Sequence, residues 1–188
     1  MRDLSLHLMD IVQNSIDAKA SKISILICAD KKSDLLEIEV KDNGIGMDSD
    51  FLKEVVNPFT TTRDTRRVGL GIPLLKASAK RASGDLEITS EKLVGTTVKA
   101  SFKISHIDRL PLGNLAQTME SLIVARPDIE YDLTLDNKKE RFIFNSFEIK
   151  RRIGEVPLTH FEVLKWIGEY VNDGVKTIFG GILDEILG

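Results

Sequence analysis

The hexapeptide Asp42-Asn43-Gly44-Ile45-Gly46-Met47 directly follows residues 35–41, in which apolar and charged side chains alternate. Such alternation is typical of a half-buried β-strand, so the strand brings Asp42 to one end of a sheet. Two glycines one residue apart allow a sharp turn and let a flat ligand lie against the backbone. A carboxylate there can accept a hydrogen bond from an exocyclic amine. An ordinary turn between a strand and a helix has the same residues, so the hexapeptide alone leaves both interpretations open.

The composition excludes several classes of protein. The chain has 188 residues, 42% of them hydrophobic, which is enough for one domain, or for one domain with a small appendage. A net charge of -3 argues against a nucleic-acid binder that works by neutralising phosphates. The single cysteine, Cys28, lies in an expected strand and predicts a core residue, with no disulfide framework and no thiolate metal site. The sequence has no apolar run of membrane-spanning length and no signal peptide at residues 1–3, which predicts a soluble, cytoplasmic protein.

Residues 3–19 predict an amphipathic helix. Its polar side carries His7, Asp10, Asn14 and Asp17, which steps of three and four residues place in one line. Two carboxylates and an amide in one line can point at a single ligand. The alternative is the solvated side of an amphipathic helix, and this is the interpretation that we prefer for His7.

The rest of the chain predicts further hairpins and helices. The expected elements are a hairpin over residues 22–41, a short helix ending before Pro58, a helix from Pro73 to near Ala82, a hairpin over residues 86–104, a helix over residues 112–126, a hairpin over residues 131–144, and a long or broken helical stretch over residues 159–187. Thr96 starts a strand and can face Asp42 across a pocket, although a threonine is also common in strands for its propensity alone.

A polar, cationic segment without periodicity separates two of these helices. Residues 60–68 include Thr61, Thr62 and Arg63 and lead into Gly69-Leu70-Gly71 at a helix start. Unpaired amides at a helix start bind anions, and arginine and threonine side chains can close over phosphates. We therefore predict a mobile loop that folds over a phosphorylated ligand, in preference to a solvent loop with incidental arginines.

Four motifs stand in a fixed order: Asp10-x-x-x-Asn14-x-x-Asp17-Ala18, Asp42-x-Gly44-x-Gly46, Gly69-x-Gly71 and Gly95-Thr96. Over residues 1–105 this order resembles the histidine-kinase-like (GHKL) ATP-binding domain, which is shared by sensor histidine kinases, gyrase B, the mismatch-repair protein MutL and the heat-shock ATPase chaperones. The resemblance implies an α/β two-layer sandwich, the Bergerat-type fold, with helices on one face of a mixed sheet and ATP between a helix and a mobile lid. Residues 106–188 are expected to form a small C-terminal α+β appendage. As a whole the chain is similar to small stand-alone bacterial ATP-binding proteins.

The resemblance also implies roles for particular residues. Asn14 matches a magnesium ligand, and Asp42 matches the carboxylate that reads adenine. The other ATP-binding residues expected are Asp17, Gly44, Gly46, Met47, Thr61, Thr62, Arg63, Gly69, Leu70, Gly71 and Thr96. Asp10 stands where the ATPase branches carry a glutamate that activates the attacking water. Because aspartate is shorter by one methylene, we expect Asp10 to act as a weak catalytic base.

Together these expectations predict an ATP-binding regulatory protein. It would use ATP and Mg²⁺ and would phosphorylate or regulate an unidentified protein partner. The sequence lacks the upstream helical hairpin with a phosphoacceptor histidine, so a kinase would act on another protein, and an anti-sigma-type serine kinase is the closest variant. The alternative is a non-enzymatic module whose lid changes shape with ATP and so gates a partner.

The chain end carries an apolar stripe, which predicts either a surface for a partner or a homodimer, or packing within the protein itself. The stripe consists of Ile178, Phe179, Ile182, Leu183, Ile186 and Leu187.

Overall fold

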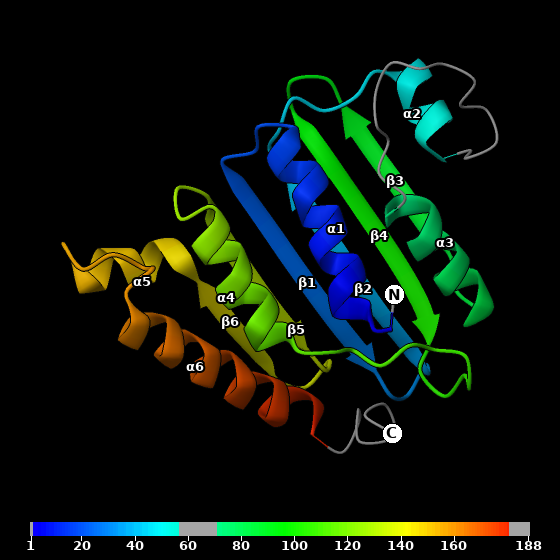
Figure 1. Ribbon diagram of the computed structural model, residues 1–188. Helices are drawn as coiled ribbons and strands as arrows, with labels where there is room; N and C mark the ends of the chain where they lie inside the picture. The colour runs from blue at the N-terminus through cyan, green and yellow to red at the C-terminus, as the bar shows by residue number, and fades with distance from the viewer. Residues whose placement is uncertain (1, 57–70, 181–188) are drawn as a thin grey trace.

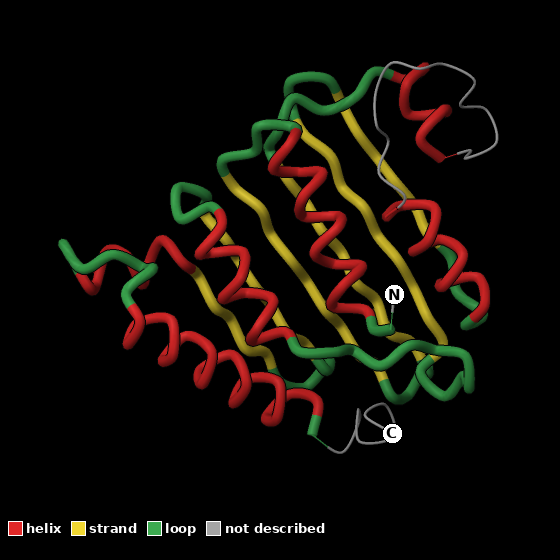
Figure 2. The backbone as a smooth tube through the Cα atoms, in the orientation of Figure 1, coloured by secondary structure: helices red, strands yellow, loops and turns green. Residues whose placement is uncertain are grey.

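Six strands form one sheet in residues 2–56 and 71–180, the part of the chain that the computed structural model describes, in the order β3-β4-β2-β1-β5-β6. The strands are β1 (Lys22–Asp30), β2 (Leu35–Asp42), β3 (Leu86–Glu91), β4 (Gly95–Lys103), β5 (Glu130–Asp136) and β6 (Arg141–Asn145). The helices are α1 (Leu4–Asp17), α2 (Ser49–Val56), α3 (Gly71–Arg81), α4 (Leu115–Ala125), α5 (Ser146–Ile153) and α6 (Phe161–Phe179). Figure 1 and Figure 2 show α1, α3 and α4 lying across one face of the sheet.

The sheet is mixed, because it combines antiparallel hairpins with a parallel pair. The pairs β1 with β2, β3 with β4 and β5 with β6 are the hairpins that the sequence predicts. Strand β1 also pairs in parallel with β5, with Ile25 opposite Leu133, so the third hairpin continues the same sheet. The predicted fold class, a two-layer α/β arrangement with helices on one face of a mixed sheet, is confirmed. The C-terminal region extends this sheet at one edge, and the division expected at residue 105 stays a prediction.

Strand periodicity puts the core on the helix side of the sheet. Ile23, Ile25 and Ile27 of β1 are fully or almost fully buried, and Leu8 and Val12 of α1 are buried as well. Alternate side chains point to opposite faces of a strand, so the other face receives the intervening polar residues. Hydrophobic burial against the helices therefore stabilises the sheet from one side.

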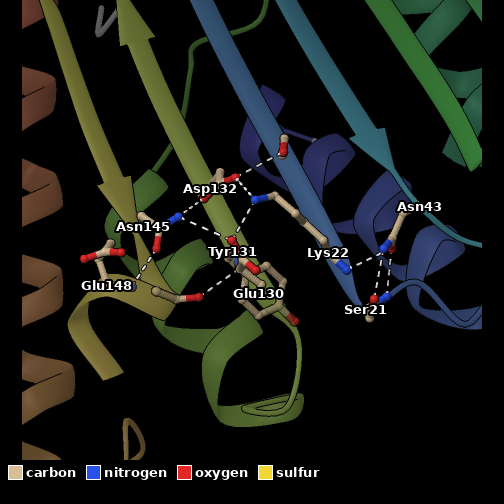
Figure 3. A network of polar contacts seen from close by, with 10 residues as sticks. Ser21, Lys22, Asn43, Glu130, Tyr131, Asp132, Asn145 and Glu148 are labelled. Carbon is tan, nitrogen blue, oxygen red and sulfur yellow. Dashed lines mark hydrogen bonds and ion pairs between the residues drawn. The ribbon is translucent and has the colours of Figure 1, made fainter. Parts of the chain in front are cut away.

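The opposite face carries a polar network that connects β1 to the C-terminal strands (Figure 3). Lys22 Nζ lies 2.6 Å from Glu130 Oε1 and 2.9 Å from Asp132 Oδ2. The Asn145 side chain donates hydrogen bonds to both of these carboxylates. Partly exposed ion pairs contribute only about 0–1 kcal/mol each, so we infer that the network serves mainly to set the register of β1 against β5.

One helix was not predicted, and another shows which of two predicted alternatives holds over residues 161–179. Helix α5 was not predicted, although Asn145 caps it by accepting a hydrogen bond from the Glu148 amide at 2.7 Å. Helix α6 is continuous from Phe161 to Phe179, within the long or broken stretch that was expected.

In the two described ranges, no helix combines the length and apolar character that crossing a membrane requires.

His7 is not on a solvated face, and the sequence interpretation of this residue was wrong. Its side chain is 3% exposed, and its Nδ1 atom makes no hydrogen bond to the described residues. The reason is that α3 packs against α1, so part of the polar side of α1 is covered. The periodicity of a single helix cannot reveal a second helix that lies on its polar side.

The apolar stripe at the chain end is partly accounted for. Ile178 and Phe179 are 2% and 1% exposed, and the Asn137 side chain donates a hydrogen bond to the Ile178 carbonyl at 2.9 Å. These two residues therefore pack within the protein itself. Ile182, Leu183, Ile186 and Leu187 lie outside the described residues.

The burial of His7 makes stability depend on pH. Burial lowers the pKa of His7 below 6.5, because desolvation disfavours the imidazolium. Below about pH 6.5 the unfolded state therefore binds more protons than the folded state, and stability falls as pH decreases. We expect the free energy of unfolding, measured with urea, to fall between about pH 7.5 and about pH 5.5, and His7→Leu to remove most of this loss. The control His160→Gln changes an exposed histidine and should keep the wild-type dependence; an equal dependence in His7→Leu would contradict the assignment.

Candidate functional site

Asp42 ends β2 as a buried carboxylate, 7% exposed, with three hydrogen-bond donors from separate segments. Its Oδ1 atom accepts from the Gly44 amide at 2.8 Å and from the Thr96 amide at 3.3 Å. Its Oδ2 atom accepts from Ser15 Oγ at 2.7 Å. An ionised carboxylate has about four lone-pair sites, so three donors leave about one acceptor position for a ligand.

The two glycines of the turn are required by the protein's own backbone. A Cβ atom on Gly46, which has a φ of 61°, would lie 2.0 Å from the carbonyl oxygen of Glu91. A Cβ atom on Gly44 would lie 2.7 Å from the carbonyl oxygen of Ala18. Neither position has room for a side chain, so the turn is held between the end of α1 and the end of β3. The close approach is therefore to the protein's own backbone, and the predicted approach of a flat ligand stays a prediction.

Ser90 connects this turn to the start of β4. Its Oγ atom accepts a hydrogen bond from the Met47 amide at 2.8 Å and lies 2.8 Å from Thr96 Oγ1. Met47 is half-buried and packs against the core. The structure therefore brings Asp42, Met47 and Thr96 together, as the sequence predicts, through a serine that the sequence analysis missed.

The polar line on α1 divides into two parts. Asp10 and Asn14 are half-buried, and the Asn14 side chain has no hydrogen bond to any described residue. Asp17 is exposed and accepts a hydrogen bond from Gln13 Nε2 at 2.9 Å, so within the described residues it does not join the Asp42 cluster.

Helix α3 begins beside Asp10. A Cβ atom on Gly71, the first residue of α3, would lie 2.7 Å from Asp10 Cβ and 3.2 Å from Asp10 Oδ2. The first amides of a helix lack partners within the helix and favour anions. Asp10 and the start of α3 thus form one polar corner next to Asn14.

The described residues offer no all-protein metal cage. Within residues 2–56 and 71–180, no group of three or more His, Cys, Asp or Glu side chains could hold a metal ion. A magnesium ion here would need phosphate and water ligands beside Asn14, which is the manner in which Mg²⁺ is usually bound. The remaining predicted contacts lie outside the described residues: Thr61, Thr62, Arg63, Gly69 and Leu70.

Ser15 is the second residue that sequence reasoning missed. It lies on the apolar side of α1, four residues after Ile11, and is 3% exposed. A serine on an otherwise apolar helix face needs a buried partner, because an unpaired buried hydroxyl is costly. That position was the available signal, although it does not identify Asp42 as the partner.

The family model described as "Histidine kinase-, DNA gyrase B-, and HSP90-like ATPase" matches residues 2–106, which is more than half of the chain. The chain belongs to this family. Membership in it implies that the chain binds a nucleotide.

The chain matches only a small part of the length of each relative. The chain is 30% identical over 126 residues to the autoinducer 2 sensor kinase/phosphatase LuxQ of Vibrio parahaemolyticus serotype O3:K6, a match that covers 63% of this chain and 15% of that protein. It is 27% identical over 165 residues to the DNA mismatch repair protein MutL of Lacticaseibacillus casei, with 68% and 25% covered. The crystal structure of the N-terminal domain of a DNA repair protein aligns with a TM-score of 0.51 at 17% identity, covering 76% of this chain and 52% of that one, and is similar in fold.

We expect Ser15→Ala to lower the free energy of unfolding by about 1–3 kcal/mol, because it removes a donor from a buried carboxylate. Urea denaturation measures this change. The matched control is Ser33→Ala, which removes a similar hydrogen bond of 2.8 Å to Asp30 at an exposed site and should cost much less. Equal costs for the two variants would show that the Ser15 hydrogen bond does not stabilise the site.

Proposed function

We propose that the protein binds Mg²⁺-ATP at the Asp42 site and uses it to regulate or phosphorylate a partner protein. The observation that carries this proposal is the Asp42 carboxylate, which is fixed by three donors and retains about one acceptor position. The exocyclic amine of adenine can donate to that position. Guanine presents a carbonyl at the corresponding place, and two acceptors repel each other.

The polar corner at Asp10 and Gly71 suits the phosphate end of the nucleotide. Ser15 contacts Asp42. On the same helix Asp10 precedes Ser15 by five residues, which is about 7.5 Å along the helix axis. The start of α3 then supplies amides for phosphate oxygens, while the Asn14 side chain, which makes no hydrogen bond to a described residue, offers its carbonyl oxygen to Mg²⁺. Helix α1 would in this way align base and phosphates along one side of the ligand.

The regulatory role rests on the matched relatives and on Asp10. A sensor kinase/phosphatase is among the proteins similar to this chain, which supports phosphotransfer to a partner protein, as in a histidine kinase or an anti-sigma-type serine kinase. The second candidate is a nucleotide-gated binding module without catalysis. It is favoured by the Asp10 side chain, whose carboxylate lies next to the start of α3 and is one methylene shorter than a glutamate.

The adenine assignment is tested at Asp42. We expect wild-type protein to bind Mg²⁺-ATP in preference to Mg²⁺-GTP, and Asp42→Asn to weaken ATP binding by about tenfold or more, because an acceptor of the amine is lost. Isothermal titration calorimetry measures both affinities. The control Asp30→Asn alters a carboxylate that also accepts a serine hydroxyl but lies at the end of β1, and it should bind like wild type. Equal wild-type affinities for ATP and GTP would refute the assignment.

The catalytic assignment is tested at Asp10. A base misplaced by about one methylene can cost a hundredfold in rate, so we expect slow turnover of bound ATP. Asp10→Glu should raise hydrolysis, and Asp10→Asn should abolish it while sparing affinity. Incubation of the protein with γ-labelled ATP and cell extract then separates the two candidates, because a kinase labels a protein and a gate only retains nucleotide. Unchanged hydrolysis in Asp10→Asn would mean that Asp10 is not a base.

A further inference from the structure

A surface cavity of about 470 Å³ opens between β6 and α6. Strand β6 contributes Arg141 and Phe142, preceded by Glu140, and α6 contributes Tyr170, Asp173 and Gly174. Strand β6 is three strands away from β2 in the sheet, which is about 14 Å at the usual strand spacing. The cavity is therefore separate from the Asp42 site.

An ordered aromatic wall bounds one side of this cavity. The Tyr170 ring lies 4.7 Å from that of Phe142 and stacks on Trp166 at 5.2 Å with an interplanar angle of 7°. A Cβ atom on Gly174 would lie 2.6 Å from the Phe142 ring, so glycine is what allows α6 to approach β6 here. Trp166 and Tyr170 nevertheless remain 48% and 37% exposed. Packed aromatic side chains that stay exposed are typical of binding surfaces.

The charged side chains that line the cavity are two carboxylates and one guanidinium. Glu140 and Asp173 are exposed and make no ion pair to any other described residue. The nearby cation, Arg141, is held by Asp136, whose Oδ2 atom accepts hydrogen bonds from its guanidinium at 2.8 and 2.9 Å. Two carboxylates at the cavity thus lack a partner among the described residues, while the one lining cation is neutralised.

Tyr170 also contacts the edge strand of the sheet. Its Oη atom donates a hydrogen bond of 3.4 Å to the Ile143 carbonyl on β6, so Tyr170 already uses one backbone acceptor of this strand.

We propose that this cavity receives an arginine side chain from a partner protein. A guanidinium stacks on aromatic rings and forms paired hydrogen bonds with carboxylates, so the aromatic wall and the two carboxylates suit it on two sides. Trp166, which stacks on Tyr170 and is 48% exposed, adds an apolar rim beside the cavity. This inference is independent of the proposed nucleotide function.

Trp166 provides a direct test, because it is the only tryptophan in the sequence. Nucleotide-free protein is titrated with acetyl-Ser-Leu-Arg-Leu-Ser-amide, and binding is followed by tryptophan fluorescence. We expect a saturable change, with binding at least about tenfold weaker for the peptide that has alanine in place of arginine. Agmatine, a free guanidinium compound without leucines for the apolar rim, should also bind at least about tenfold more weakly.

Matched variants locate the binding site. The double variant Glu140→Gln and Asp173→Asn should weaken binding of the arginine peptide by about tenfold or more. Arg141→Gln should strengthen it, because the Asp136 carboxylate then loses the guanidinium that neutralises it. Glu169→Gln, an exposed change on α6 that does not line the cavity, should bind like wild type. No saturable change with the arginine peptide, equal binding of the two peptides or an unaffected double variant would overturn the proposal. If agmatine bound as tightly as the peptide, the proposal that the partner is a protein would be overturned. Because no nucleotide is present, these outcomes do not depend on ATP binding.

Discussion

The buried Asp42 carboxylate is the interaction on which the arrangement of α1, β2 and β4 depends. It ties together Ser15 of α1, Gly44 of the turn and Thr96 of β4. A buried charge costs several kcal/mol unless hydrogen bonds compensate it, so these three segments cannot move apart independently. The same constraint orients the carboxylate, because each donor removes one direction in which it could turn. A binding site of this kind is preorganised by the protein before any ligand arrives.

A parallel strand pair joins these elements to the C-terminal region. Strand β5 lies beside β1, and Lys22 contacts both Glu130 and Asp132 across the pair. Close by, the Asn43 side chain accepts hydrogen bonds from the amides of Ser21 and Lys22, so the turn after Asp42 is attached to the same end of β1 (Figure 3). The Asp42 cluster and the cavity at β6 consequently lie on one continuous sheet.

The contact between α1 and α3 has consequences at both ends. At Gly71 it brings the start of α3 against Asp10, and further along it buries His7 without a hydrogen-bond partner for Nδ1 among the described residues. Close helix packing thus places the first amides of α3 beside the Asp10 carboxylate and makes one turn of α1 sensitive to protonation. Both effects follow from placing a second helix on the polar side of an amphipathic one, where sequence periodicity predicts solvent.

The sequence by itself determined the elements whose signals are local. The alternation before Asp42, the spacing of Asp10 and Asn14, and the order of the glycine motifs predicted the strands, the first helix and the family, because these patterns span only a few residues each. Only the tertiary structure decided which distant residues meet. Ser15 donates a hydrogen bond to Asp42, which is 27 positions away, and the Met47 amide donates one to Ser90, which is 43 positions away. No local pattern predicts such pairs. The pairing of β5 with β1 and the cavity between β6 and α6 could not be predicted for the same reason. Both arise from packing between distant segments, and the sequence of one segment does not indicate its contact with the other.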